Sequence, residues 1–228
     1  MLILKDRRTR WLLGGGLITL LAVLSAVVLW KMPKERQYLY FSFCVVALAL
    51  ILFWMGIENR RIGSRRLVLI SVITALCCIG RFIPLFKPVT ALTVLGAIYL
   101  GPTAGFLVGA MSALISNFYF GQGPWTPYQM LAWGLIGFCA GLLSVPLKRS
   151  RLLLLLYGFF SGVLFSAVMD LWTVLWQYGT ITPALFGAAT LTALPHTLLY
   201  AVSNLLFLLF LSKPFGEKLE RVRIKYGL

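Results

Sequence analysis

Long apolar segments separated by short basic clusters make up nearly the whole chain, and this pattern restricts it to folds that lie in a membrane. Sixty per cent of the 228 residues are hydrophobic and 12% are charged, whereas soluble domains carry about a quarter of charged residues. Backbone groups in lipid have to be hydrogen-bonded within the protein, which a helix achieves by itself. The sequence therefore predicts an all-α integral membrane protein.

Eight apolar segments are predicted to cross the bilayer, since a span takes about 20 residues. The first follows basic residues as a signal peptide does, but it is too long for one and Trp30-Lys31 is not a small-residue cleavage site, so we expect it to remain. Gly101-Pro102 alone separates the fourth and fifth, which predicts a tight helical hairpin. Pro195 is expected to kink or interrupt the eighth. The predicted spans are 11–30, 38–57, 67–83, 89–100, 103–117, 127–147, 152–177 and 184–212.

The basic residues indicate how these spans are oriented. Eight spans place both termini on one side, and with that side as the cytoplasm 16 of the 21 Lys and Arg residues fall inside. This is the positive-inside bias of membrane proteins. It accounts for the net charge of +15 without nucleic-acid binding. The termini are therefore predicted to be cytoplasmic, and the loops 81–88, 118–127 and 177–186 to face outwards.

The longest polar stretch between spans, Glu58 to Arg66, suggests a division of the chain. It joins an N-terminal transmembrane hairpin, residues 1–60, to a six-helix membrane core, residues 61–228.

A polar, ring-rich stretch interrupts the apolar pattern between Asn117 and Gln129. Its amide, hydroxyl and indole groups, stiffened by Pro124 and Pro127, suit a medium-sized organic ligand. An aromatic belt at the membrane surface is the alternative, but the three amide side chains favour the ligand. The candidate binding residues here are Asn117, Tyr119, Gln122, Trp125, Tyr128, Gln129 and Trp133.

The outward loop 81–88 carries Arg81 and Lys87, which run against the positive-inside bias. Either they bind an anionic or carbonyl-rich ligand, or their side chains extend to the lipid headgroups. Both interpretations stay open, and both residues are candidates for ligand binding.

Polar residues form one helical stripe in each of the last two spans: Ser166, Asp170, Thr173 and Gln177 in the seventh, and His196, Tyr200 and Asn204 in the eighth. A carboxylate inside a membrane normally has a partner, and His196 is the candidate for Asp170. The pair either lines a pocket or orients the two helices structurally. Asp170, Gln177, His196 and Tyr200 are the ligand-binding candidates.

Small residues recur at intervals of four and predict close helix packing. One stripe is Gly101, Gly105 and Gly109, and another is Gly137 and Gly141. In the third span Ser71, Ala75 and Cys78 form a smooth face on which another membrane protein can dock. The four cysteines lie in apolar stretches without metal-ligand spacing. The chain lacks GxxxxGK[ST], HExxH and GxSxG motifs, so we expect no enzyme activity, cofactor or metal.

The stretch from Gly80 to Gly141, above all Asn117-Phe-Tyr-Phe-Gly-Gln-Gly-Pro-Trp-Thr-Pro127, resembles the substrate-binding S component of energy-coupling factor (ECF) vitamin transporters. The resemblance implies a six-helix capsule that holds its ligand near the outer face, under the loops 81–88 and 118–127. It also implies a membrane coupling subunit and two cytoplasmic ATPases as partners. This chain has Ser71-xxx-Ala75 where the family usually presents Ala-xxx-Ala for docking.

The resemblance is strongest to the S components for cobalamin or related corrinoids, and it implies a multi-pass protein of a prokaryotic cytoplasmic membrane. Two other functions are alternatives. One is an S-component-like scaffold of the cell envelope. The other is a membrane enzyme acting on a lipid or isoprenoid, which would need a carboxylate cluster or metal ligands that the chain lacks.

Overall fold

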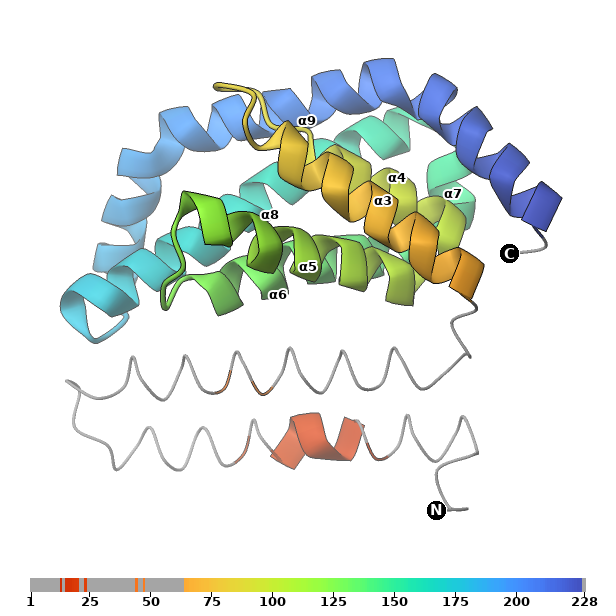
Figure 1. The fold of residues 1–228 in the computed structure, drawn as a ribbon. Coiled ribbons are helices and arrows are strands. Elements are labelled where there is room, and N and C mark those ends of the chain that lie inside the picture. The colour runs from red at the N-terminus through yellow and green to blue at the C-terminus, as the bar shows by residue number, and fades with distance from the viewer. Residues whose placement is uncertain are drawn as a thin grey trace.

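The computed structural model describes residues 64–226 and, earlier in the chain, residues 13, 15–20, 23, 44 and 47. The predicted N-terminal hairpin, residues 1–60, lies almost wholly outside the described residues. From residue 64 onwards every regular element is an α-helix, which confirms the all-α prediction (Figure 1). In chain order the helices are α3 (Ser64–Gly80), α4 (Val89–Leu100), α5 (Pro102–Phe120), α6 (Thr126–Leu142), α7 (Ser144–Arg149), α8 (Arg151–Tyr178) and α9 (Pro183–Tyr226).

The observed helices follow the predicted spans, with notable differences in two of them. The bounds of α4 agree with the prediction, and α4 and α5 form the expected hairpin through Gly101. The predicted span 127–147 is divided at Leu143 into α6 and the short α7. Helix α9 continues through both Pro195 and Pro214. It bends into an arc instead of breaking (Figure 1), because a proline removes one helical hydrogen bond and crowds the preceding turn.

Three of the described helices, α5, α8 and α9, are long and apolar enough to cross a membrane, and α4 is a shorter apolar helix. Helices α3 and α6 have 17 residues each, which is the lower limit for a span. The chain is therefore a membrane protein in its described part. The number of eight spans and the cytoplasmic placement of both termini remain predictions.

Helix α4 occupies the centre of the bundle. All of its residues except Tyr99 are buried, and α3, α5, α6 and α9 pack around it. Helices α8 and α9 form a long antiparallel pair beside this core. In Figure 1 the α3–α4, α5–α6 and α8–α9 connections lie toward one end, on the left. The start of α3, helix α7 and the C-terminus lie toward the other end. We call the end with the three connections the outer end and the opposite end the inner end, after the predicted orientation.

Glycines determine how closely α5 and α6 approach. Gly105 and Gly137 face each other so closely that a Cβ on either would collide with the carbonyl oxygen of the other. Only glycine permits this contact between backbones. The prediction that these stripes serve helix packing is confirmed, and the crossing fixes the ends of α5 and α6 relative to each other.

Candidate ligand-binding site

The ring-rich stretch consists mostly of helix ends and only partly of loop. Helix α5 continues to Phe120 and stops at Gly121, whose φ of 103° favours glycine and whose N–H bonds to the Asn117 carbonyl at 2.8 Å. Helix α6 begins at Thr126, with Pro127 in its first turn. The loop is thus 121–125, shorter than predicted. This places Asn117 and Tyr119 on the last turn of α5, and Tyr128 and Gln129 on the first turn of α6.

A chain of hydrogen bonds joins three segments at the outer end. The Arg81 guanidinium donates through Nη1 to the Ser116 hydroxyl and, at 2.7 Å, to Oδ1 of Asn117. The Asn117 amide donates to Oγ1 of Thr126 at 2.9 Å and to Oε1 of Gln129 at 2.8 Å. Asn117 is only 1% exposed, so its amide is committed to this network. The network fixes the start of the outward loop 81–88 to the ends of α5 and α6.

Arg81 keeps donors that the network does not use. A guanidinium has five N–H donors, and among the described residues both hydrogen bonds of Arg81 come from Nη1. The group also lies over two aromatic rings, with Cζ 4.7 Å from the centre of the Phe120 ring and 5.3 Å from that of Trp133. Nη2 and Nε are therefore free to donate to a ligand at a cation that is already held in place.

Partial burial changes the acidity of both basic residues of this loop. Burial lowers the pKa of Arg81 below its ordinary value. It also lowers the pKa of Lys87, and the nearby charge of Arg81 lowers it further. Both side chains thus carry a desolvation cost that an anionic or carbonyl-rich ligand would relieve.

A buried aromatic layer lies beneath Arg81. The Trp133 ring stacks on Phe165 with 4.6 Å between centres and 17° between planes. The indole of Trp133 donates to the Tyr200 hydroxyl at 2.8 Å, and that hydroxyl bonds with Thr90 at 2.7 Å. Trp133 and Tyr200, both predicted as site residues, are therefore brought together as a rigid floor. Sequence reasoning missed Thr90 and Phe165, which carry no signal beyond ordinary apolar helix composition.

Three exposed rings stand at the outer edge of the site. Phe82, Tyr119 and Phe120 contact one another with ring centres 4.6 to 5.1 Å apart. Tyr119 is 72% exposed, the most of the three. Aromatic faces next to a guanidinium can bind another flat ring by stacking.

The remaining predicted loop residues have structural partners. Gln122 is exposed, donates to the Leu114 carbonyl at 2.8 Å and accepts from Thr126 at 3.0 Å. The Trp125 ring lies against Gly123, where a Cβ would collide with it. Tyr128 is 1% exposed and packs on Trp172, with ring centres 5.2 Å apart. These side chains support the site from behind and beside it.

Asp170 and His196 lie close enough to interact electrostatically, but among the described residues they form no ion pair, so the predicted pairing stays a prediction. Asp170 is 7% exposed, and its Oδ2 atom has no hydrogen-bond partner among the described residues. His196 is exposed and lies nearly parallel to Tyr200, with ring centres 6.5 Å apart. The reason is helical drift: positions four apart rotate by about 40°, so the buried face of α9 follows Tyr200 and leaves His196 at its edge. Gln177 is exposed near the outer end of α8.

Two of the three predicted docking residues are exposed on α3. Ser71 and Ala75 are exposed, while Cys78 is half-buried with its Sγ 3.9 Å from the Ser112 carbonyl of α5. Exposed Val68, Val72 and Ile79 surround the two small residues.

Comparisons with known proteins give one family. The family model described as "ECF-type riboflavin transporter, S component" matches residues 61–215. A curated relative, a UPF0397 protein of Aliivibrio salmonicida (strain LFI1238), is 31% identical over 97 residues, which are 39% of this chain and 52% of that protein. The chain thus spans about half the length of the curated relative that it matches. No solved structure gives a significant match.

Proposed function

We infer the function from one premise: the chain belongs to the family of S components of ECF-type riboflavin transporters. The family consists of membrane transporter subunits and is not a class of enzymes. We propose that this chain captures a vitamin or vitamin precursor at its outer end, in a prokaryotic cytoplasmic membrane that it crosses several times. It would deliver the ligand when docked on a membrane coupling subunit that carries two cytoplasmic ATPases.

The observation that carries this proposal is that hydrogen bonds fix the guanidinium of Arg81 in place and still leave some of its N–H donors available. It combines a fixed position, free Nη2 and Nε donors and a rigid aromatic floor of Trp133 and Tyr200. Such a group of a few oriented polar atoms among rings is typical of sites for organic ligands. Gln129 accepts from Asn117, which also accepts from Arg81, and among the described residues the amide nitrogen of Gln129 forms no hydrogen bond.

The vitamin itself is the finer part of the proposal. The description of the family model names riboflavin, whereas the prediction of cobalamin or a related corrinoid rests on the sequence resemblance alone and gains no support from the comparisons. Both ligands are large ring systems rich in carbonyl or amide groups, which suit the arginine and the exposed rings. We therefore give riboflavin priority and keep the corrinoid as the second ligand to test.

Docking on the coupling subunit is proposed to use the α3 face around Ser71 and Ala75. Small residues at its centre let another helix approach closely, and the valine and isoleucine side chains around them would be buried. The first 60 residues are proposed to be an addition to the six-helix core, which is supported by the start of the family match at residue 61.

Binding by the purified full chain tests the proposed site. Riboflavin and cyanocobalamin are each titrated in detergent, with isothermal calorimetry as the readout. We expect one of them to bind and Gln129→Ala to weaken that binding at least fivefold. Gln177→Ala is the matched control, since it removes the same amide from an exposed position on α8 at the same end of the bundle, outside the Asn117 network. Equal binding by wild type and both variants would overturn the site, and binding of neither vitamin would overturn the substrate proposal.

A further inference from the structure

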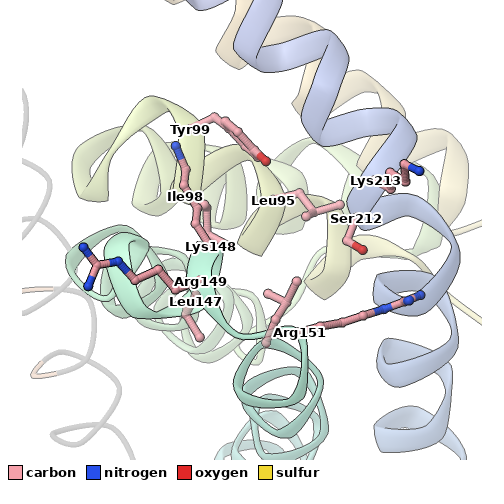
Figure 2. Close-up of a pocket in the computed structure, with 10 residues that line it drawn as sticks. Leu95, Ile98, Tyr99, Leu147, Lys148, Arg149, Arg151, Ser212 and Lys213 are labelled. Carbon is pink, nitrogen blue, oxygen red and sulfur yellow. The ribbon is translucent and has the colours of Figure 1, made fainter.

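A cavity lies at the inner end, away from the proposed vitamin site. It has a volume of about 310 Å³ and is bounded by α4, α7, α8 and α9 (Figure 2). Lys148, Arg149, Arg151 and Lys213 line it, together with the hydroxyls of Tyr99 and Ser212. Four cations and two hydroxyls around one small cavity have no role in the capture of a vitamin at the opposite end.

Two of these cations already have partners. Lys148 lies 3.5 Å from the carboxylate of Glu220 and 4.2 Å from the centre of the Tyr99 ring. Arg151 donates to the Leu209 carbonyl of α9 at 3.0 Å. These contacts hold α4, α7, α8 and α9 together around the cavity.

The other two cations, Arg149 and Lys213, have no such partner in the described part of the chain. In the described part of the chain no hydrogen bond or ion pair engages Arg149 or Lys213, and both are exposed. Figure 2 shows them on opposite sides of the cavity, Arg149 on α7 and Lys213 on α9, with their charged ends directed outwards. Two acidic residues, Glu217 and Glu220, act electrostatically on Tyr99, so the four cations that line the cavity exceed the acidic charge beside it.

The cavity lies where the sequence changes from apolar to basic, which is the depth of lipid phosphates. On α8 the apolar run starts at Leu152, directly after Arg151, and on α9 Lys213 ends the apolar part. The adjoining surface is suited to acyl chains: Leu152 is 67% exposed and Phe210 is 68% exposed. Basic pockets between transmembrane helices are a known type of site for anionic headgroups.

We propose that this cavity binds the phosphate of an anionic phospholipid, with Arg149 and Lys213 closing over the headgroup and the acyl chains lying along α8 and α9. Tyr99 and Ser212 supply hydroxyl donors to the phosphate oxygens. Its volume is at the small end for ligand sites, which suits a headgroup and excludes a whole lipid. The bound lipid would bridge α7 and α9 at the membrane surface.

Native mass spectrometry of the full-length protein tests this proposal. The protein is released from detergent micelles that contain phosphatidylglycerol or phosphatidylcholine at equal concentration. We expect phosphatidylglycerol to bind at least tenfold more tightly. Arg149→Gln combined with Lys213→Gln should reduce that binding at least fivefold. The matched control is Lys218→Gln with Arg221→Gln, which removes the same charge from exposed residues of the same end that do not line the cavity, and we expect less than a twofold loss.

The other outcomes each overturn part or all of the proposal. Equal losses in the two double variants would show diffuse attraction by the basic surface and no site. Equal binding of the two lipids would exclude recognition of an anion. Displacement of phosphatidylglycerol by millimolar inorganic phosphate would identify free phosphate, not lipid, as the occupant. A thermal melting curve of each variant confirms that it is folded.

Discussion

The two ends of the helical bundle use their cations in opposite ways. At the outer end Arg81 is half-buried, bonded to Ser116 and Asn117, and placed over Phe120 and Trp133. At the inner end Arg149 is exposed and without a partner among the described residues. An arginine is therefore part of a hydrogen-bonded network at the outer end and of an exposed charged surface at the inner end.

This difference indicates which cations contribute to folding stability and which are available for ligand binding. A buried guanidinium with oriented partners is costly to disturb, because its removal leaves acceptors unsatisfied in a dry environment. An exposed cation contributes little to folding and remains available for a ligand from the membrane surface. We expect substitutions at the outer end to change stability and vitamin binding together, and those at the inner end to leave stability unchanged.

The largest effect is expected for Arg81→Gln. It removes both bonds to Ser116 and Asn117 and the cation over two rings, so we expect a loss of about 3 kcal/mol in the free energy of unfolding and at least a tenfold weaker vitamin binding. Unfolding by SDS in mixed micelles measures the first, and calorimetry the second. Arg149→Gln removes the same group at the inner end and should change neither. Equal effects of the two substitutions would remove the contrast between the ends.

A smaller loss in the free energy of unfolding is expected for Asn117→Ala. The substitution keeps Arg81 but breaks its link to Thr126 and Gln129, which we expect to cost about 2 kcal/mol, since a buried charged donor loses an acceptor. If the network acts as a unit, Arg81→Gln and Asn117→Ala combined will destabilise by less than the sum of the single losses. Strict additivity in this double-mutant cycle would contradict a connected network.

Trp133→Phe is expected to cost about 1 kcal/mol. It keeps an aromatic ring over Phe165 but deletes the indole N–H that bonds to the Tyr200 hydroxyl, while Thr90 still bonds to it. The same SDS titration measures the change. If Trp133→Phe left the free energy of unfolding unchanged while Trp133→Leu lowered it, ring packing alone would stabilise the aromatic layer.

The smallest effect is expected for Lys148→Gln at the inner end. Its pair with Glu220 is 3.5 Å long and both side chains are about a third exposed, so its contribution to stability is about 0.5 kcal/mol or less. Raising the salt concentration should abolish even that difference. A loss above that of Trp133→Phe would mean that the inner end is built like the outer one.

Much of the fold follows from the sequence, because hydrophobic length and glycine spacing determine it. The bounds of α4 and the α4–α5 hairpin at Gly101 were predictable in this way. The end of α5 was misplaced at Asn117, since a polar residue was taken as the boundary, whereas Gly121 with its positive φ ends the helix. Pro195 did not interrupt α9, because packing against α8 outweighs one lost hydrogen bond.

The site was predictable as a set of residues but not as a network. Composition singled out Arg81, Asn117 and Gln129, yet nothing in the pattern showed that Arg81 bonds to a residue 36 positions later. That contact depends on how α3 packs against α5. Thr90 and Phe165 belong to ordinary apolar helices, and only the fold brings them under Trp133. The role in ligand binding that the polar periodicity of α9 suggests for His196 stays a prediction.

Uptake into vesicles tests most directly the claim that this chain is the vitamin-binding subunit of an ATP-driven importer. The full chain is reconstituted alone or with an ECF coupling module, and labelled riboflavin or cyanocobalamin is supplied outside. Alone it should bind the vitamin without accumulating it, and with the module it should accumulate it only when ATP is present. Ala75→Trp should abolish uptake but not binding, while Leu76→Trp on the flank of α3 should retain both. Uphill accumulation by the chain alone without ATP would contradict the account and indicate an ion-coupled carrier, with the buried Asp170 as its first candidate coupling residue.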